Sequence, residues 1–119
     1  PKSQRVEYRI AAADGNPHLV VAAAIACGLY GINNKMALQP NVEGNAYDLG
    51  NSETNKELPN SLEKATDVFK NSSVMREIFG DTWVDHFALT REWECKKYES
   101  NKQSDTDWHW MLDRYFEII

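Results

Sequence analysis

The chain has 119 residues, of which 42% are hydrophobic and 26% are charged, and its formal net charge is -5 at pH 7. These values are typical of one small globular domain, so they exclude a broadly disordered chain and a membrane protein. Because the basic residues are scattered and outnumbered by acids, we also expect no nucleic-acid partner.

The first predicted element is a β-strand over residues 4–11, in which charged side chains alternate with apolar or aromatic ones. The charged face carries Arg5, Glu7 and Arg9. The carboxylate can bind a divalent cation, and the two guanidinium groups can bind phosphate or substrate carboxylate oxygens. The same alternation is also typical of any antiparallel strand with one solvated face. Because a lone strand cannot satisfy its own backbone groups, we expect its pairing strands to lie outside these 119 residues.

A buried helix is predicted over residues 17–32. Asn16 is a favourable N-cap, and Pro17 occupies the first helical position, where an N–H group is not needed. Small apolar side chains dominate the helix, which favours close packing on nearly every side. Its apolar run is shorter than the roughly 20 residues that a bilayer requires, so we expect no membrane span.

A long loop over residues 33–59 and a helical cap over residues 60–119 complete the chain. The loop is polar, rich in asparagine and without a hydrophobic period. The first of four helical segments in the cap begins at Asn60, with Glu63 at the spacing of a capping box.

Three further helical segments are predicted in the cap. Their expected starts are Ser72 or Ser73, Asp81 or Thr82, and Thr106. Gly80 ends the first of them, and the second runs to about Ser100 with Val84 and Ala88 near its apolar face and Glu94 largely solvated. The last carries apolar residues at helical spacing, as in a core or an interface: Trp108, Leu112, Tyr115 and Ile119.

The cysteines and histidines do not form a pattern that predicts a disulfide framework or a metal site. Cys27 and Cys95 lie far apart in apolar helical patterns, which is typical of free thiols in a reducing compartment, although a single buried bridge stays open. His86 and His109 lie near aspartates but lack the spacing of a histidine metal site, so we expect none in this segment.

Several short blocks follow one another along nearly the whole chain. They are Pro1-Lys2, Arg5 to Arg9, Ala13 to Pro17, Gly28 to Ile32, Asn34-Lys35, Tyr47 to Leu49, Leu58-Pro59, Ser61 to Glu63, Thr106 to Trp108 and Arg114 to Phe116. No single block is specific, but their order and spacing resemble the C-terminal segment of the glutamine synthetase catalytic domain.

The resemblance implies an α+β fragment that is mainly α. One N-terminal strand belongs to a larger antiparallel sheet, and a buried small-residue helix, a long loop and four C-terminal helical segments follow. The implied activity is that of a cytoplasmic ATP-dependent ligase. It phosphorylates the side-chain carboxylate of glutamate, and ammonia then displaces the phosphate to give glutamine. The implied cofactors are ATP and Mg²⁺ or Mn²⁺, and the implied partners include the upstream part of the same domain and further copies in a homo-oligomer.

The resemblance also assigns roles to individual residues. Glu7 resembles the carboxylate that binds the metal bridging the phosphates of ATP. Arg9 resembles the catalytic arginine that holds the glutamate carboxylate and the transferred phosphoryl group. Arg5 resembles the arginine that contacts nucleotide phosphate, and Lys2 stands at a position near the nucleotide. We expect the isolated segment to be inactive, because the remaining metal ligands and most of the substrate pocket would lie upstream of Pro1.

Departures from the family pattern leave the amine substrate open. His18 and His109 replace an aromatic residue and a glutamate that are common in the family, and neither lies on the charged face of the strand. The blocks at residues 86–88 and 91–94 look closer to glutamine-synthetase-like ligases. A γ-glutamyl ligase that uses a polyamine or another organic amine is therefore the alternative. A non-catalytic relative with a structural or regulatory role is the alternative from another class.

Overall fold

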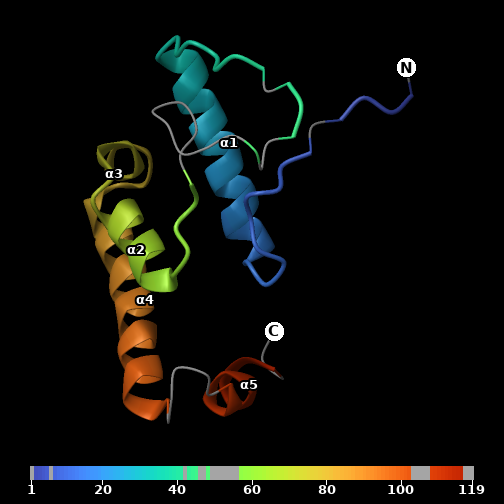
Figure 1. The fold of residues 1–119 in the computed structure, drawn as a ribbon. Helices are drawn as coiled ribbons and strands as arrows, with labels where there is room; N and C mark the ends of the chain where they lie inside the picture. The colour runs from blue at the N-terminus through green and yellow to red at the C-terminus, as the bar shows by residue number, and fades with distance from the viewer. Residues whose placement is uncertain are drawn as a thin grey trace. The chain divides into compact units, whose positions relative to one another are not determined.

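The computed structural model describes residues 2–5, 7–41, 43–45, 48, 57–102 and 108–116. The helices of this part are α1 (Pro17–Asn33), α2 (Leu62–Lys70), α3 (Ser73–Phe79), α4 (Asp81–Asn101) and α5 (His109–Tyr115) (Figure 1). They belong to two compact units, of which one contains Pro1–Met36 and the other Ala37–Ile118. None of the helices that the structure describes is long and apolar enough to cross a bilayer.

The prediction of a strand over residues 4–11, and with it the α+β fold class, is wrong. Across the described residues the regular secondary structure is helical, and no strand or sheet is present. The described residues of segment 4–11 are irregular and exposed to solvent. The physical reason is that a strand exists only through hydrogen bonds to a neighbouring strand, and the described chain offers none to this segment.

Local signals place the start of α1. The side-chain oxygen of Asn16 accepts hydrogen bonds from the backbone N–H groups of His18 at 3.0 Å and Leu19 at 3.4 Å. Gly15 lies in the turn just before this cap, where a Cβ atom would be 3.1 Å from the carbonyl oxygen of Ala12. Asn16 is thus the N-cap that the sequence indicates, and the absence of a side chain at residue 15 allows the close turn before it.

The prediction that α1 is buried is also wrong for this chain. No described residue of α1 is buried, and the larger apolar side chains on one of its faces are more than half exposed. These side chains are Val21, Ile25, Leu29 and Ile32. An apolar composition shows that a helix can be buried. Burial itself requires another surface that covers the helix.

The core of the second unit lies along α4. Val84 and Ala88 are completely buried there, as the apolar face of this helix predicts. The helices α2 and α3 both pack against α4 (Figure 1). Aromatic rings from all three helices contact one another with centroid separations of 5.0 to 6.0 Å, and they belong to Phe69, Phe79, Trp83 and Phe87. Each such pair contributes about 0.5–1.5 kcal/mol beyond its buried area.

The N-cap of α2 lies one residue later than predicted. The hydroxyl of Ser61, rather than the amide of Asn60, accepts a hydrogen bond from the backbone N–H of Lys64 at 3.2 Å. Glu63 therefore stands one position too early in the helix to complete a capping box. Serine and asparagine are nearly equal as N-caps, so two adjacent candidates leave this boundary uncertain by one residue.

Both ends of α3 follow the sequence. The hydroxyl of Ser72 accepts a hydrogen bond from the backbone N–H of Met75 at 3.2 Å, which makes Ser72 the N-cap. Gly80 then joins α3 to α4 with a φ angle of 81°. This left-handed conformation is one that glycine adopts without strain, so the chain can leave one helix and enter the next at a single residue.

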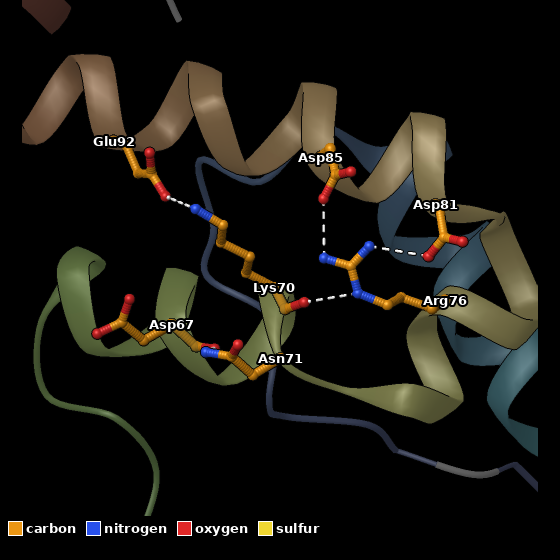
Figure 2. A network of polar contacts seen from close by, with 7 residues as sticks. All are labelled: Asp67, Lys70, Asn71, Arg76, Asp81, Asp85 and Glu92. Carbon is orange, nitrogen blue, oxygen red and sulfur yellow. Dashed lines mark hydrogen bonds and ion pairs between the residues drawn. The ribbon is translucent and has the colours of Figure 1, made fainter.

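A polar network fastens α2 and α3 to α4 (Figure 2). The Arg76 guanidinium donates hydrogen bonds to the backbone oxygen of Lys70 at 2.9 Å and to carboxylate oxygens of Asp81 and Asp85, both at 2.8 Å. Lys70 in turn forms an ion pair with Glu92, with an Nζ to Oε1 distance of 2.6 Å. The hydrogen bonds to Asp85 and Asp81 raise the pKa of Arg76. One arginine thus joins three helices.

Candidate functional site

The segment over residues 2–9 carries the four side chains predicted to bind nucleotide, metal and glutamate. Lys2 lies in a turn, and Arg5, Glu7 and Arg9 follow in an irregular part of the chain. All four are exposed to solvent. Residue 6, which lies between them, falls outside the described residues.

The structure brings Glu7 and Arg9 together. The Nε atom of Arg9 donates a hydrogen bond to Oε1 of Glu7 at 2.6 Å. The Arg9 side chain is 83% exposed and that of Glu7 57%, so solvent screens the pair and its effect on stability is small. Within the described chain, neither Lys2 nor Arg5 joins this ion pair. Of the three side chains predicted to share one face of the segment, Glu7 and Arg9 are thus in contact.

The side chains of this segment are of the chemical types that bind a nucleotide and its metal ion. The carboxylate of Glu7 is the hard oxygen donor that Mg²⁺ and Mn²⁺ prefer. Arginine and lysine side chains are the usual donors to phosphate oxygens. Among the residues that the structure describes, no group of three or more His, Cys, Asp or Glu side chains stands ready to hold a metal ion. Glu7 would thus be one ligand of several.

A second polar cluster joins α4 to α5, and its central residue is Glu94. Only 8% of Glu94 is exposed. Arg114 donates to both carboxylate oxygens, from Nε to Oε1 at 2.9 Å and from Nη2 to Oε2 at 3.3 Å. The hydroxyl of Tyr115 also donates to Oε1. Bidentate contacts of this kind combine a strong attraction with a fixed geometry, so the cluster orients α5 against α4.

The protonation states of this cluster follow from its contacts. The hydrogen bond from Arg114 lowers the pKa of Glu94, and this effect outweighs the opposing effect of burial. Burial, together with the hydrogen bond to Glu94, raises the pKa of Tyr115 to about 12. At neutral pH Glu94 is therefore an anion and Tyr115 a protonated donor, which is the combination that the hydrogen bonds require.

The sequence reasoning missed this cluster, because it placed Glu94 on the solvated face of its helix. A signal was present in the spacing. Glu94 lies seven residues after Phe87 and four before Tyr98, so all three share one face of α4. A charged residue in register with the apolar face of a helix predicts a paired charge, and Arg114 is that partner.

Comparisons with known proteins identify the family. The family model described as glutamine synthetase, catalytic domain, matches residues 1–111. Type-1 glutamine synthetase 2 of Dictyostelium discoideum is 39% identical over 99% of this chain and 22% of its own length. Glutamate–isopropylamine ligase of a Pseudomonas species is 42% identical over 97% of this chain and 24% of its own. Gamma-glutamylputrescine synthetase of Escherichia coli is 33% identical over 92% of this chain and 22% of its own.

No solved structure matches the chain. The chain spans about a quarter of the length of the curated relatives it matches. The family match nevertheless covers nearly every residue, and it confirms the resemblance carried by the ordered sequence blocks. The chain belongs to the glutamine synthetase family, and it corresponds to part of the catalytic domain of that family.

Proposed function

We propose that the chain is the C-terminal part of an ATP-dependent ligase that makes glutamine from L-glutamate and ammonia. In this reaction a side-chain carboxylate oxygen of glutamate attacks the γ-phosphorus of ATP and releases ADP. Ammonia then attacks the carbonyl carbon of the γ-glutamyl phosphate, loses a proton and releases phosphate. The membership of the chain in the glutamine synthetase family supports this reaction class and a place in nitrogen metabolism.

The observation that carries the proposal at residue level is the pairing of Glu7 with Arg9 at 2.6 Å. This pairing supports the proposal, because a carboxylate that could bind a metal lies beside a guanidinium that could bind a carboxylate. We assign Glu7 to the divalent metal, Arg9 to the glutamate carboxylate and the transferred phosphoryl group, and Arg5 and Lys2 to the nucleotide. When bound, Mg²⁺ or Mn²⁺ neutralises charge on the phosphates. Arg9 orients the acceptor carboxylate, which otherwise repels the triphosphate.

The segment alone should be inactive, because one carboxylate and three cations do not complete a metal site or a substrate pocket. Other parts of the same catalytic domain and further subunits of a homo-oligomer complete the proposed enzyme. A cytoplasmic location also belongs to the proposal, since the reaction consumes ATP.

A second candidate is a γ-glutamyl ligase that uses an organic amine in place of ammonia. The observation that supports it is that the chain is about as similar to the glutamate–isopropylamine ligase, at 42% identity, as to the type-1 glutamine synthetase 2, at 39%. The two candidates share activation of glutamate and differ only in the nucleophile. Residues 2–9 therefore serve both, and the amine has to be determined by assay.

The test is phosphate release from ATP by the full-length protein that contains this chain. The assay compares glutamate with ammonia against glutamate with isopropylamine or putrescine. Glu7→Gln should abolish metal-dependent turnover and leave the far-UV circular dichroism spectrum unchanged, because the Glu7 side chain is mostly exposed. Glu77→Gln, an exposed glutamate on α3, is the charge-matched control. Turnover that survives Glu7→Gln contradicts the metal assignment, and a wild-type protein without phosphate release contradicts the ligase function and favours a non-catalytic relative.

A further inference from the structure

A shallow groove of about 430 Å³ lies on the second unit, along α4 and beside Arg114 of α5. Its lining combines the apolar side chains of Leu89 and Trp93 with the Thr90 hydroxyl and the charged groups of Arg91, Glu94 and Arg114. More than half of Leu89 and almost half of Trp93 is exposed. The groove thus offers an apolar wall next to fixed charges, which is the usual composition of a small-molecule site.

The guanidinium group of Arg91 is held in place by a hydroxyl group and an aromatic ring. Its Nε atom donates a hydrogen bond to Oγ1 of Thr90 at 3.3 Å, and its Cζ atom lies 5.3 Å from the centroid of the Phe87 ring. The Thr90 hydroxyl is itself fixed, because it donates to the backbone oxygen of Phe87 at 2.6 Å. No carboxylate in the described part of the chain forms an ion pair with Arg91. Its two terminal nitrogens therefore remain available as a planar pair of donors.

The charges of the groove sum to a positive value. Glu94 and Arg114 neutralise each other, because both oxygens of Glu94 accept hydrogen bonds from Arg114 and one accepts a further bond from Tyr115. Arg91 adds a second positive charge, so Arg91, Glu94 and Arg114 together carry one net positive charge. The Trp93 indole lines the same groove, and the Lys97 and Arg114 cations lie 5.2 and 5.6 Å from the centroid of its ring. A small net positive charge with an indole ring in the same groove suits a monoanion with an apolar body better than a highly charged phosphate.

We propose that this groove binds a small organic carboxylate with a flat apolar body. The carboxylate contacts the terminal nitrogens of Arg91, and the apolar body lies against Trp93 and Leu89. His86, which also lines the groove, provides an additional ring N–H donor. The site is defined by α4 and α5 alone, so it does not depend on the roles proposed for residues 2–9.

Titration calorimetry with benzoate, on the full-length protein that contains this chain, tests this inference. We expect a Kd on the order of 1 mM, since a ligand this small makes few contacts. Benzamide lacks the charge and acetate lacks the apolar body, so each should bind about tenfold more weakly or worse. Arg91→Gln should weaken benzoate by about tenfold or more, because it removes the charged fork. Lys96→Gln removes an equal charge from α4 outside the groove lining and should leave the affinity unchanged.

Three results would overturn the proposal. They are benzamide binding as tightly as benzoate, equal weakening by Lys96→Gln and Arg91→Gln, and no benzoate binding at about ten times the expected Kd. If circular dichroism shows that Arg91→Gln is unfolded, Arg91→Lys decides, because lysine keeps the charge without the planar fork. Weakening by about threefold or more then supports the site, and an unchanged affinity overturns it.

Discussion

Replacing Glu94 by glutamine should loosen α5 from α4 while leaving the other helices packed. Glutamine keeps the size of the side chain and one acceptor oxygen, but it removes the charge and turns one carboxylate oxygen into an NH₂ group. That NH₂ group would face a nitrogen of the Arg114 guanidinium, so one of the two hydrogen bonds from Arg114 is lost. The change therefore acts on the only contact between these two helices that involves a buried charge among the described residues.

The expected loss of stability is moderate. A hydrogen bond to a charged group contributes about 1.5–3 kcal/mol. The Arg114 side chain is 40% exposed, so solvent screens the attraction, and Glu94→Gln should destabilise the second unit by about 1–2 kcal/mol. For a unit of this size, that loss lowers the Tm by about 5–15 °C.

The effect should depend on pH in a defined direction. The hydrogen bond from Arg114 lowers the pKa of Glu94 in the folded chain below its ordinary value of 4.5. The Glu94 anion therefore stabilises the fold above pH 4.5, and this stabilisation is lost as the pH falls through the lower pKa of the folded state. The difference between wild type and Glu94→Gln should be full at neutral pH and should shrink in acid.

Thermal unfolding followed by circular dichroism, at neutral and acidic pH, measures both effects. Amide hydrogen exchange locates the change, because residues 109–115 should lose more protection than α2 and α4. Glu77→Gln is the control, since Glu77 is an exposed glutamate of α3. Equal effects of the two substitutions, or unchanged protection of α5, would refute the idea that Glu94 holds this helix.

Three further predictions concern the same unit and the cysteines. In an alkaline titration followed by tyrosinate absorbance, Tyr115 should ionise with a pKa of about 12, so the stability from its protonated form should be lost between about pH 10 and 12. Ionisation of Tyr115 near pH 10 would contradict this. Arg76→Gln removes hydrogen bonds to two aspartates that join α3 to α4, so it should lower the Tm in a thermal melt, whereas Arg9→Gln, at an exposed pair, should not. In labelling with a thiol-specific disulfide reagent, exposed Cys27 should react before Cys95, because burial raises the pKa of Cys95; equal rates would count against this.

The sequence alone determined the features that depend on near neighbours. Asn16 and Ser72 are N-caps because their side chains reach backbone N–H groups only two or three residues away. Gly80 ends a helix because its own backbone adopts a left-handed conformation. The family was also determined at this level, since the order and spacing of short sequence blocks require no coordinates.

Only the tertiary structure decided which surfaces meet. The charge pattern of residues 4–11 predicted a strand and the composition of α1 predicted burial, yet the described chain supplies neither a pairing strand nor a covering surface. Conversely, Glu94 was expected in solvent and is buried, because Arg114 lies beside it from a helix twenty residues further along the chain. Side-chain periodicity fixes which way a residue points, whereas hydrogen-bond ladders, burial and ion pairs require a second surface that distant parts of the chain must provide.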